Sequence, residues 1–302
     1  MTGAGGFIGC AVVEALVRRG ARVRALAAAP GQTIWGLPSG VSPVFADIED
    51  RQTLAGLATG ADAAIHLAGP PSVHESFQAP LEYARVHGGG TLALLEACRV
   101  AGVPRFVYLS SAEVYGKPQA NPVSEGDRLD PRSPYAAAKA AAEHYVRAYA
   151  HSFGMQVVVL RPFSVYGPRL RPHSVMATIL RQAMEADEVV LADLDPVRDY
   201  CFVSDVVEGV LAAACARGLT ETTFNLGSGT GTSVGDLAAL ALRLVGREVP
   251  IRAEPSRGRP AGTDITRLVA DRSRAETVLG WTPAVLLEDG VCRTLSWMRT
   301  HA

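Results

Sequence analysis

Residues 2–9 read Thr-Gly-Ala-Gly-Gly-Phe-Ile-Gly, a turn in which glycine recurs every third position, at Gly3, Gly6 and Gly9. Glycines at this spacing let the backbone turn tightly, approach a pyrophosphate and pack the following helix against a sheet. Residues 7–19 carry apolar side chains at helical spacing and end at Gly20, and residues 21–26 then favour a strand. This order predicts a dinucleotide-binding α/β unit, with phosphates at the positive end of the first helix.

The first half of the chain continues this alternation. Strands are predicted near 22–26, 42–45, 62–66, 105–110 and 156–160, with helices between them, which is typical of a parallel, doubly wound Rossmann-type sheet. After Pro168 the alternation breaks down, and Pro/Gly/Arg-rich segments at 167–172 and 255–260 flank shorter elements. We predict a dinucleotide-binding domain at 1–167 and a smaller α+β substrate lobe at 168–302, with possible strand or helix returns to the first domain.

Composition excludes several classes of protein. The 302 residues are 48% hydrophobic and carry a net charge of −1 without a block of like charges. That balance argues against a nucleic acid or an acidic membrane surface as partner. Five cysteines without paired spacing and seven scattered histidines predict neither a disulfide framework nor a metal site. We found no apolar stretch long enough to span a bilayer and no secretory leader, so we expect a cytoplasmic protein.

The run Ser133-Pro134-Tyr135-Ala-Ala-Ala-Lys139 predicts chemistry. A spacing of four places phenol and ammonium on one helix face. A phenol titrates near ~10, and lowering that pKa by about three units takes roughly 4 kcal/mol of interaction with a cation. Ser111 ends an apolar strand at the sheet edge where ligands bind. It could hydrogen-bond the same substrate hydroxyl that Tyr135 would deprotonate. An isolated Tyr–Lys pair would be accidental, but with Ser111 and the glycine turn it predicts a nicotinamide-dependent site.

Further stretches carry a family resemblance. They are 46–48 (Ala-Asp-Ile), 66–69 (His-Leu-Ala-Gly), 160–168, 198–200 (Arg-Asp-Tyr), 224–228 and 279–283. Together with the motifs above, the chain resembles the extended short-chain dehydrogenase/reductases over essentially its whole length. Within these it is most similar to the NAD-dependent nucleotide-sugar epimerase/dehydratase family.

The resemblance implies roles for individual residues. Catalytic roles fall to Ser111, Glu113, Tyr135 and Lys139. The implied cofactor contacts are Gly3, Gly6, Phe7, Ile8, Gly9, Asp47, Ile48, Leu67, Ala68, Gly69, Tyr135, Lys139 and Pro162. The implied contacts with a nucleotide sugar are Ser111, Glu113, Ser164, Arg198 and Arg259, of which the two arginines would hold the diphosphate, a task suited to a guanidinium fork.

The chain departs from the family pattern in three places. Only Met1 and Thr2 precede the glycine turn, so the usual central first strand is missing. We expect unpaired backbone on two neighbouring strands and hypothesise an internal start or a truncated chain. The stretch 26–30 (Leu-Ala-Ala-Ala-Pro) lacks the acidic residue that accepts the adenine ribose, so we predict NAD but leave NADP open. Ser164 and His87 stand where the family commonly has asparagine.

Several reactions remain open. Transient oxidation at carbon 4 of the sugar followed by return of the hydride gives 4-epimerisation of a UDP-type sugar, which we rank first. Glu113 also suits a 4,6- or 5,6-dehydratase or a decarboxylase, although Ala112 stands where dTDP-glucose dehydratases have aspartate. Keto-sugar reduction and a non-catalytic dinucleotide-binding role rank lower. The helices near 81–101 and 135–151 predict a homodimer through a four-helix bundle, or else they simply cover the sheet.

Overall fold

A computed structural model of the protein describes residues 1–28, 36–219, 222–255, 263 and 265–301. Its main sheet contains only parallel pairs, in the orders β1-β2 and β3-β4-β5-β9. The strands are β1 (Ala25–Ala27), β2 (Pro43–Phe45), β3 (Ala64–His66), β4 (Arg105–Leu109), β5 (Gln156–Pro162) and β9 (Thr223–Leu226). The expected Rossmann-type α/β fold is confirmed.

The chain start joins the two groups of strands. The Thr2 amide donates to the Ile65 carbonyl at 3.0 Å, and the Leu26 amide donates to the Met1 carbonyl at 2.8 Å. Thr2 thereby forms parallel bridges with both Leu26 and His66. We expected unpaired backbone on the two neighbouring strands. That expectation is wrong where Met1 and Thr2 pair with them. The two neighbours, β1 and β3, are each only three residues long.

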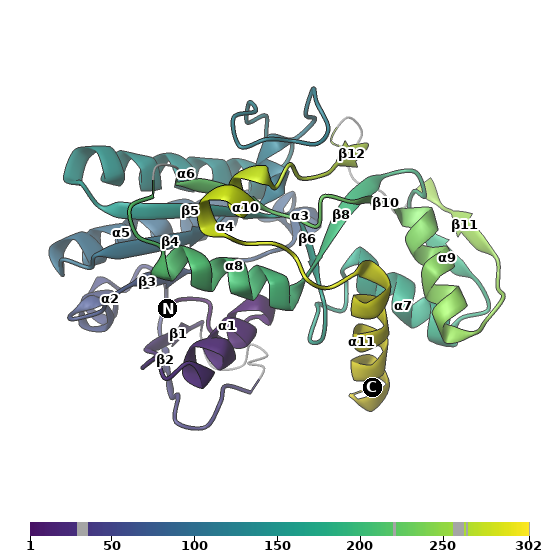
Figure 1. The fold of residues 1–302 in the computed structure, drawn as a ribbon, viewed down its shortest axis with the longest axis horizontal. Helices are drawn as coiled ribbons and strands as arrows, with labels where there is room; N and C mark the ends of the chain where they lie inside the picture. The colour runs from purple at the N-terminus through teal and green to yellow at the C-terminus, as the bar shows by residue number, and fades with distance from the viewer. Residues whose placement is uncertain (29–35, 220–221, 256–262, 264, 302) are drawn as a thin grey trace.

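Helices cover both faces of this sheet (Figure 1). On one face lie α1 (Phe7–Arg18) and α8 (Val203–Cys215), and on the other α2 (Arg51–Ala58), α5 (Gly90–Val100) and α6 (Pro134–Phe153). Along β5, Val158 packs with the α8 side and Val157 with the α6 side, as the alternation of a strand requires. The apolar side chains of β5 therefore pack against helices on both faces of the sheet, which lies between two helical layers.

The helix predicted near 81–101 consists of three pieces. A short α4 (Pro80–Tyr83) leads into a π-helical turn, η1 (Ala84–Gly89), and then into α5. Gly90 lies against Ile48, and a β-carbon at Gly90 would fall 2.5 Å from Ile48 Cγ2. π-Helical turns occur mainly at functional sites, and this one carries His87.

The residues from Ser164 onward build a smaller set of sheets, in the order β10-β8-β12 with β6 beside β8, and β11-β7. Its elements are β6 (Ser164–Tyr166), α7 (Val175–Glu185), β7 (Val189–Leu191), β8 (Val197–Phe202), β10 (Gly231–Ser233), α9 (Val234–Val245), β11 (Ile251–Ala253), β12 (Arg267–Leu268) and α11 (Leu287–Thr300). Three later elements return to the first sheet: α8, β9 and α10 (Ser273–Leu279). No helix of the described residues is long and apolar enough to cross a membrane.

Candidate active site

The glycine turn has the shape of a phosphate cradle. Gly3 has a φ of +69°, and a β-carbon there would lie 2.7 Å from the Ala68 amide nitrogen. A β-carbon at Gly9 would lie 1.9 Å from the Gly3 carbonyl oxygen. Helix α1 starts after Gly6 without a side-chain cap, so the positive end of its dipole and its first amide groups remain available to an anion. These features fit a dinucleotide pyrophosphate. Phe7 and Ile8, in the first turn of α1, pack into the core beneath it.

A buried polar chain runs under the end of β3. The Ala68 amide donates to Thr2 Oγ1 at 3.3 Å, Thr2 Oγ1 lies 2.6 Å from His66 Nδ1, and His66 Nε2 lies 2.9 Å from Thr91 Oγ1. Because Thr91 donates its own proton to the His87 carbonyl, His66 carries its proton on Nε2. Burial, with Lys139 nearby, lowers the pKa of His66 to about 3. The chain of hydrogen bonds therefore fixes the segment Leu67, Ala68 and Gly69 with a neutral imidazole.

Asp47 and Ile48, predicted to meet the adenine, follow β2. Ile48 is buried against α5. Asp47 accepts a hydrogen bond from the Glu49 amide and pairs with Arg85 at 3.1 Å; the amide first and the guanidinium second lower its pKa. The stretch 26–30 was predicted to lie at the adenine ribose. Its last two residues, 29 and 30, lie outside the described residues.

The amino end of α6 positions the predicted base. Ser133 caps the helix by accepting from the Ala136 amide at 3.1 Å, and Pro134 occupies the first turn. Tyr135 and Lys139 are both buried on the inner face. Ser111 caps the short 3-10 helix η2 (Ala112–Tyr115) directly after β4, and its side chain lies close enough to the Tyr135 phenol to lower the pKa of that phenol. The structure thus brings together Ser111, Tyr135 and Lys139, three residues from two elements.

The electrostatics of this group differ from the sequence-based expectation. Burial raises the pKa of Tyr135 to about 12, although the Ser111 contact lowers it. The Lys139 ammonium donates to the Leu109 carbonyl at 2.7 Å, and burial lowers its pKa to about 7. A lysine that is itself half discharged and directed to a carbonyl does not stabilise the phenolate. A further positive charge, such as a nicotinamide ring at this edge, is needed before Tyr135 can act as a base.

Glu143 extends the same helix face by another turn and was missed by the sequence reasoning. It is fully buried, accepts from Ser110 Oγ at 2.6 Å and pairs with Arg161 at 2.6 Å. Burial raises the pKa of Glu143, but Arg161, Ser110 and Arg147 together outweigh burial and hold that pKa below its usual value. Because Ser110 precedes Ser111, this pair ties the end of β4 to α6. The spacing of four after Lys139 is the signal that could have revealed it.

Three successive carbonyls between β3 and α3 (Val73–Ser76) hold side chains around Tyr135. The Pro70 carbonyl accepts from His87 Nε2 at 2.9 Å, that of Pro71 from Arg171 at 3.2 Å and that of Ser72 from the Tyr83 hydroxyl at 2.7 Å. The rings of His87 and Tyr83 lie edge-on to Tyr135, with centroids 5.5 and 6.2 Å away.

His87 presents an unfilled acceptor to this site. Its Nε2 faces a carbonyl and must carry the proton, so its Nδ1 bears a lone pair. That atom is buried and finds no hydrogen-bond partner among the residues that the structure describes. Burial first, and Lys139 second, lower the pKa of His87 well below its usual value. The ring edge lies over Gly69, where a β-carbon would fall 2.1 Å from the ring. A neutral His87 can accept a hydrogen bond from a ligand hydroxyl at this edge.

The predicted substrate contacts lie on both lobes. Glu113, in η2, is close enough to Tyr135 to raise the phenol pKa, whereas Arg171 lowers it. Pro162 ends β5 and Ser164 begins β6. Arg198 lies in β8, with one guanidinium nitrogen 3.0 Å from the Val197 carbonyl. Arg259 lies outside the described residues.

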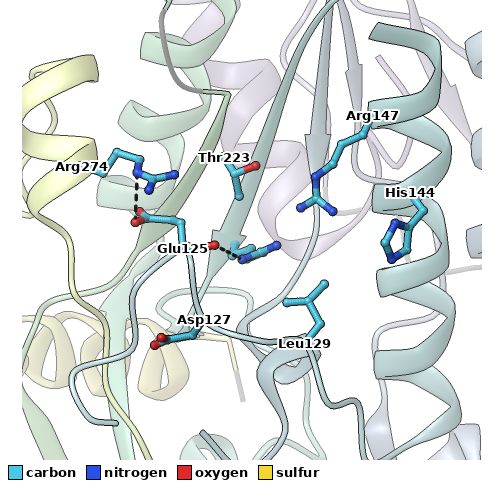
Figure 2. A pocket seen from close by; sticks show the side chains of 8 residues that line it. Glu125, Asp127, Leu129, His144, Arg147, Thr223 and Arg274 are labelled. Carbon is cyan, nitrogen blue, oxygen red and sulfur yellow. Dashed lines mark hydrogen bonds and ion pairs between the residues drawn. The ribbon is translucent and has the colours of Figure 1, made fainter. Parts of the chain in front are cut away.

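A cleft of about 490 Å³ lies elsewhere, beside β5, β9 and the outer side of α6 (Figure 2). Its charges compensate one another: Glu125 pairs with Arg274 at 3.4 Å and its carbonyl accepts from Arg161, while Arg147 pairs with Glu143. None of the residues predicted to bind cofactor or substrate lines it. This cleft borders the ion pairs of Glu143 with Arg147 and Arg161 on their solvent side. It is not part of the Tyr135 site.

Comparisons with known proteins agree with this geometry. A family model described as the NAD dependent epimerase/dehydratase family matches residues 1–227. The UDP-glucose 4-epimerase of Mycolicibacterium smegmatis is 36% identical over 313 aligned residues, covering 100% of this chain and 98% of the relative. The crystal structure of a Thermotoga maritima UDP-glucose 4-epimerase with UDP-glucose has a TM-score of 0.90 at 31% identity, covering 99% and 98% of the two chains. MoeE5 in complex with UDP-glucuronic acid and NAD has a TM-score of 0.88 at 31% identity, covering 100% and 98%.

Proposed function

The chain belongs to the NAD dependent epimerase/dehydratase family, and from that premise we propose that it is a UDP-sugar 4-epimerase that uses NAD. The observation that carries the proposal is the meeting of three features at one sheet edge. These are the close-packed glycine turn, the Tyr135 phenol beside Ser111, and the buried Lys139. Epimerisation at carbon 4 requires no further acid or base.

In the proposed reaction the 4-hydroxyl of the sugar loses its proton to Tyr135, and Ser111 orients that hydroxyl. NAD, held by the glycine turn, Leu67 to Gly69 and Lys139, supplies the hydride acceptor and later the donor. The resulting ketone would turn over in the site so that the hydride returns to the opposite face of carbon 4, while Tyr135 returns the proton to the oxygen. Lys139 stays between the phenol and the cofactor, where its pKa of about 7 lets it share a proton at neutral pH.

Product analysis tests the proposal. Purified protein is incubated with NAD and with UDP-glucose, UDP-glucuronic acid, dTDP-glucose or GDP-mannose, and the products are separated and weighed by mass spectrometry. A UDP-linked product of unchanged mass but different stereochemistry at carbon 4 supports the proposal, and Tyr135→Phe should lose that product by a factor of about 10² or more. Conversion of none of the UDP-sugars would refute it.

Glu113 supports a second candidate, dehydration or decarboxylation of the 4-keto sugar. Its charge acts on Tyr135, so its carboxylate lies near the reacting carbons, and elimination needs such an additional group. Loss of 18 mass units (water) or of 44 mass units (carbon dioxide) from the substrate marks this reaction. Under this candidate Glu113→Gln abolishes the elimination and spares isomerisation. An elimination that survives the substitution removes Glu113 from the mechanism.

We propose a homodimer through α4, α5 and α6. Leu81, Val100 and Phe153 on these helices are 84%, 72% and 54% exposed, an apolar set that a partner surface would cover. Val100→Asp should shift the sedimentation coefficient from dimer to monomer, whereas Leu286→Asp, at an equally exposed site before α11, should not.

The five cysteines, all thiols, support a reducing, cytoplasmic compartment.

A further inference from the structure

Arg171 reaches from the second lobe to the first beside the reacting phenol. It lies on the segment between β6 and α7, and its Nη2 donates to the Pro71 carbonyl at 3.2 Å. The neighbouring carbonyls of Pro70 and Ser72 hold His87 and Tyr83, whose rings flank Tyr135. Arg171 therefore belongs to the shell of side chains around the Tyr135 hydroxyl, and its charge acts on that phenol.

No carboxylate of the described residues pairs with Arg171. Within the described ranges the structure gives it one contact, a carbonyl, and no carboxylate. Its neighbours on the same lobe differ, because Arg169 pairs with Glu14 at 2.6 Å. A guanidinium has five N–H donors in a planar fork that matches a carboxylate. One bond to a carbonyl leaves most of these donors for a ligand.

The position of Arg171 indicates which part of a ligand it meets. A sugar whose 4-hydroxyl faces Tyr135 places the substituents of carbons 3 and 5 next to that phenol, while its diphosphate lies across the ring. Glu113, from the first lobe, lies close enough to act on the same phenol, so side chains of both charges lie near the reacting carbon. An anionic substituent would be repelled on the Glu113 side and held on the Arg171 side.

From this arrangement we propose that Arg171 is a specificity-determining residue and that the substrate is a UDP-linked sugar with a carboxylate at carbon 6. This inference rests on the proposed function and deepens it, because it names the class of sugar that the Tyr135 site takes. The carboxylate binds the free edge of the Arg171 guanidinium, and the Pro71 carbonyl holds that guanidinium in place. Arg171 is exposed, so a neutral hexose would leave its remaining N–H donors to water and gain no charge-assisted hydrogen bond from them.

The test compares UDP-glucuronic acid with UDP-glucose on NAD-saturated protein. Binding is measured by calorimetry, and conversion is measured as kcat/KM for the change at carbon 4. The variants are Arg171→Gln and a matched control, Arg181→Gln. Arg181 also donates to a main-chain carbonyl of this segment, that of Pro172 at 2.8 Å, but it lies on α7. Arg171→Lys tests whether the charge suffices without the fork.

Wild-type protein should bind and convert the acidic sugar about 10- to 100-fold better than the neutral one, as expected for a charge-assisted hydrogen bond. Arg171→Gln should abolish that preference, because it should lower kcat/KM for UDP-glucuronic acid about 10-fold or more beyond any change for UDP-glucose. Arg171→Lys should retain part of the preference, and Arg181→Gln all of it. Equal losses for both sugars in Arg171→Gln would show a structural role and overturn the inference, as would a wild-type enzyme without preference.

Failure of the two proposals can be told apart. If the acidic sugar binds more tightly through Arg171 but neither sugar is converted, the specificity inference stands and the proposed 4-epimerisation fails. If both sugars are epimerised with equal efficiency, the proposed function stands and the role of Arg171 fails.

Discussion

Replacing Lys139 by methionine should remove activity and, at neutral pH, stabilise the fold. The ammonium is buried beside the Tyr108 ring, with its nitrogen 5.0 Å from the ring centroid, and it donates to the Leu109 carbonyl. Burial lowers its pKa from 10.5 to about 7. Catalytic proton transfer of this kind contributes about 10²–10⁴ in rate, so the variant should lose at least that lower factor in kcat.

The magnitude follows from the pKa. A lowering of about 3.5 pKa units, at 1.36 kcal/mol each, means that burying Lys139 destabilises the folded state by about 4 kcal/mol at pH 7. The variant loses a donor to the Leu109 carbonyl, about 2 kcal/mol, and a cation–π contact, about 1 kcal/mol. We therefore expect Lys139→Met to be more stable than wild type by about 1 kcal/mol at pH 7.

The stability difference between Lys139→Met and wild type changes sign as the pH rises. The folded pKa lies below the unfolded one, so between pH 7 and 10.5 the unfolded chain binds more protons and wild-type stability increases with pH. The advantage of Lys139→Met should shrink by about 2 kcal/mol between pH 7 and 9 and change sign. Urea unfolding of the cofactor-stripped proteins at both pH values measures this difference.

The chain contains a matched control, since Lys117 is its only other lysine and is exposed. Lys117→Met should change the free energy of unfolding by less than about 0.5 kcal/mol at either pH. A difference between Lys139→Met and wild type that does not vary with pH would refute the reasoning, because it would mean that the buried ammonium titrates as it does in water.

Two further predictions concern the framework of the site. Gly9→Ala places a methyl group 1.9 Å from the Gly3 carbonyl oxygen and should abolish NAD binding in calorimetry. The control Gly56→Ala, where the β-carbon meets open space in α2, should bind NAD normally. Unchanged NAD binding by Gly9→Ala would contradict the role of the glycine turn as a phosphate cradle. Glu143→Gln leaves its buried arginine partner uncompensated and should lower the free energy of unfolding by about 3 kcal/mol, while Glu188→Gln, in an exposed pair, should alter it by less than about 1 kcal/mol. Equal effects of the two Gln substitutions would contradict the buried network.

Local spacing was enough to predict the parts of the site that lie close together in sequence. Gly3 to Gly9 form one turn, and Tyr135 and Lys139 share one helix face, so their arrangement depends only on helix and turn geometry. The same rule applied one turn further would have found Glu143. The apolar runs placed β3, β4 and β5 for a similar reason, because these strands are buried on both faces.

Contacts made by the topology were beyond such reasoning. Arg171 reaches the first lobe only because β6 pairs with β8 and turns the following segment back across the sheet edge. The π-helical turn that carries His87 was predicted as ordinary helix, since spacing does not report an extra residue in a turn. The charge state of Lys139 depends on complete burial and on a carbonyl from β4, neither of which can be read from the spacing of four.

The central claim is that hydrogen leaves carbon 4 of the sugar and returns to the same carbon without reaching water. The most direct measurement is the fate of deuterium placed at carbon 4 of the UDP-sugar substrate, followed by mass spectrometry and proton NMR in ordinary water. The account predicts that the 4-epimer retains the deuterium at carbon 4. An epimer that has exchanged this deuterium for solvent hydrogen would contradict the account, because inversion would then proceed by proton removal from carbon and not by hydride transfer.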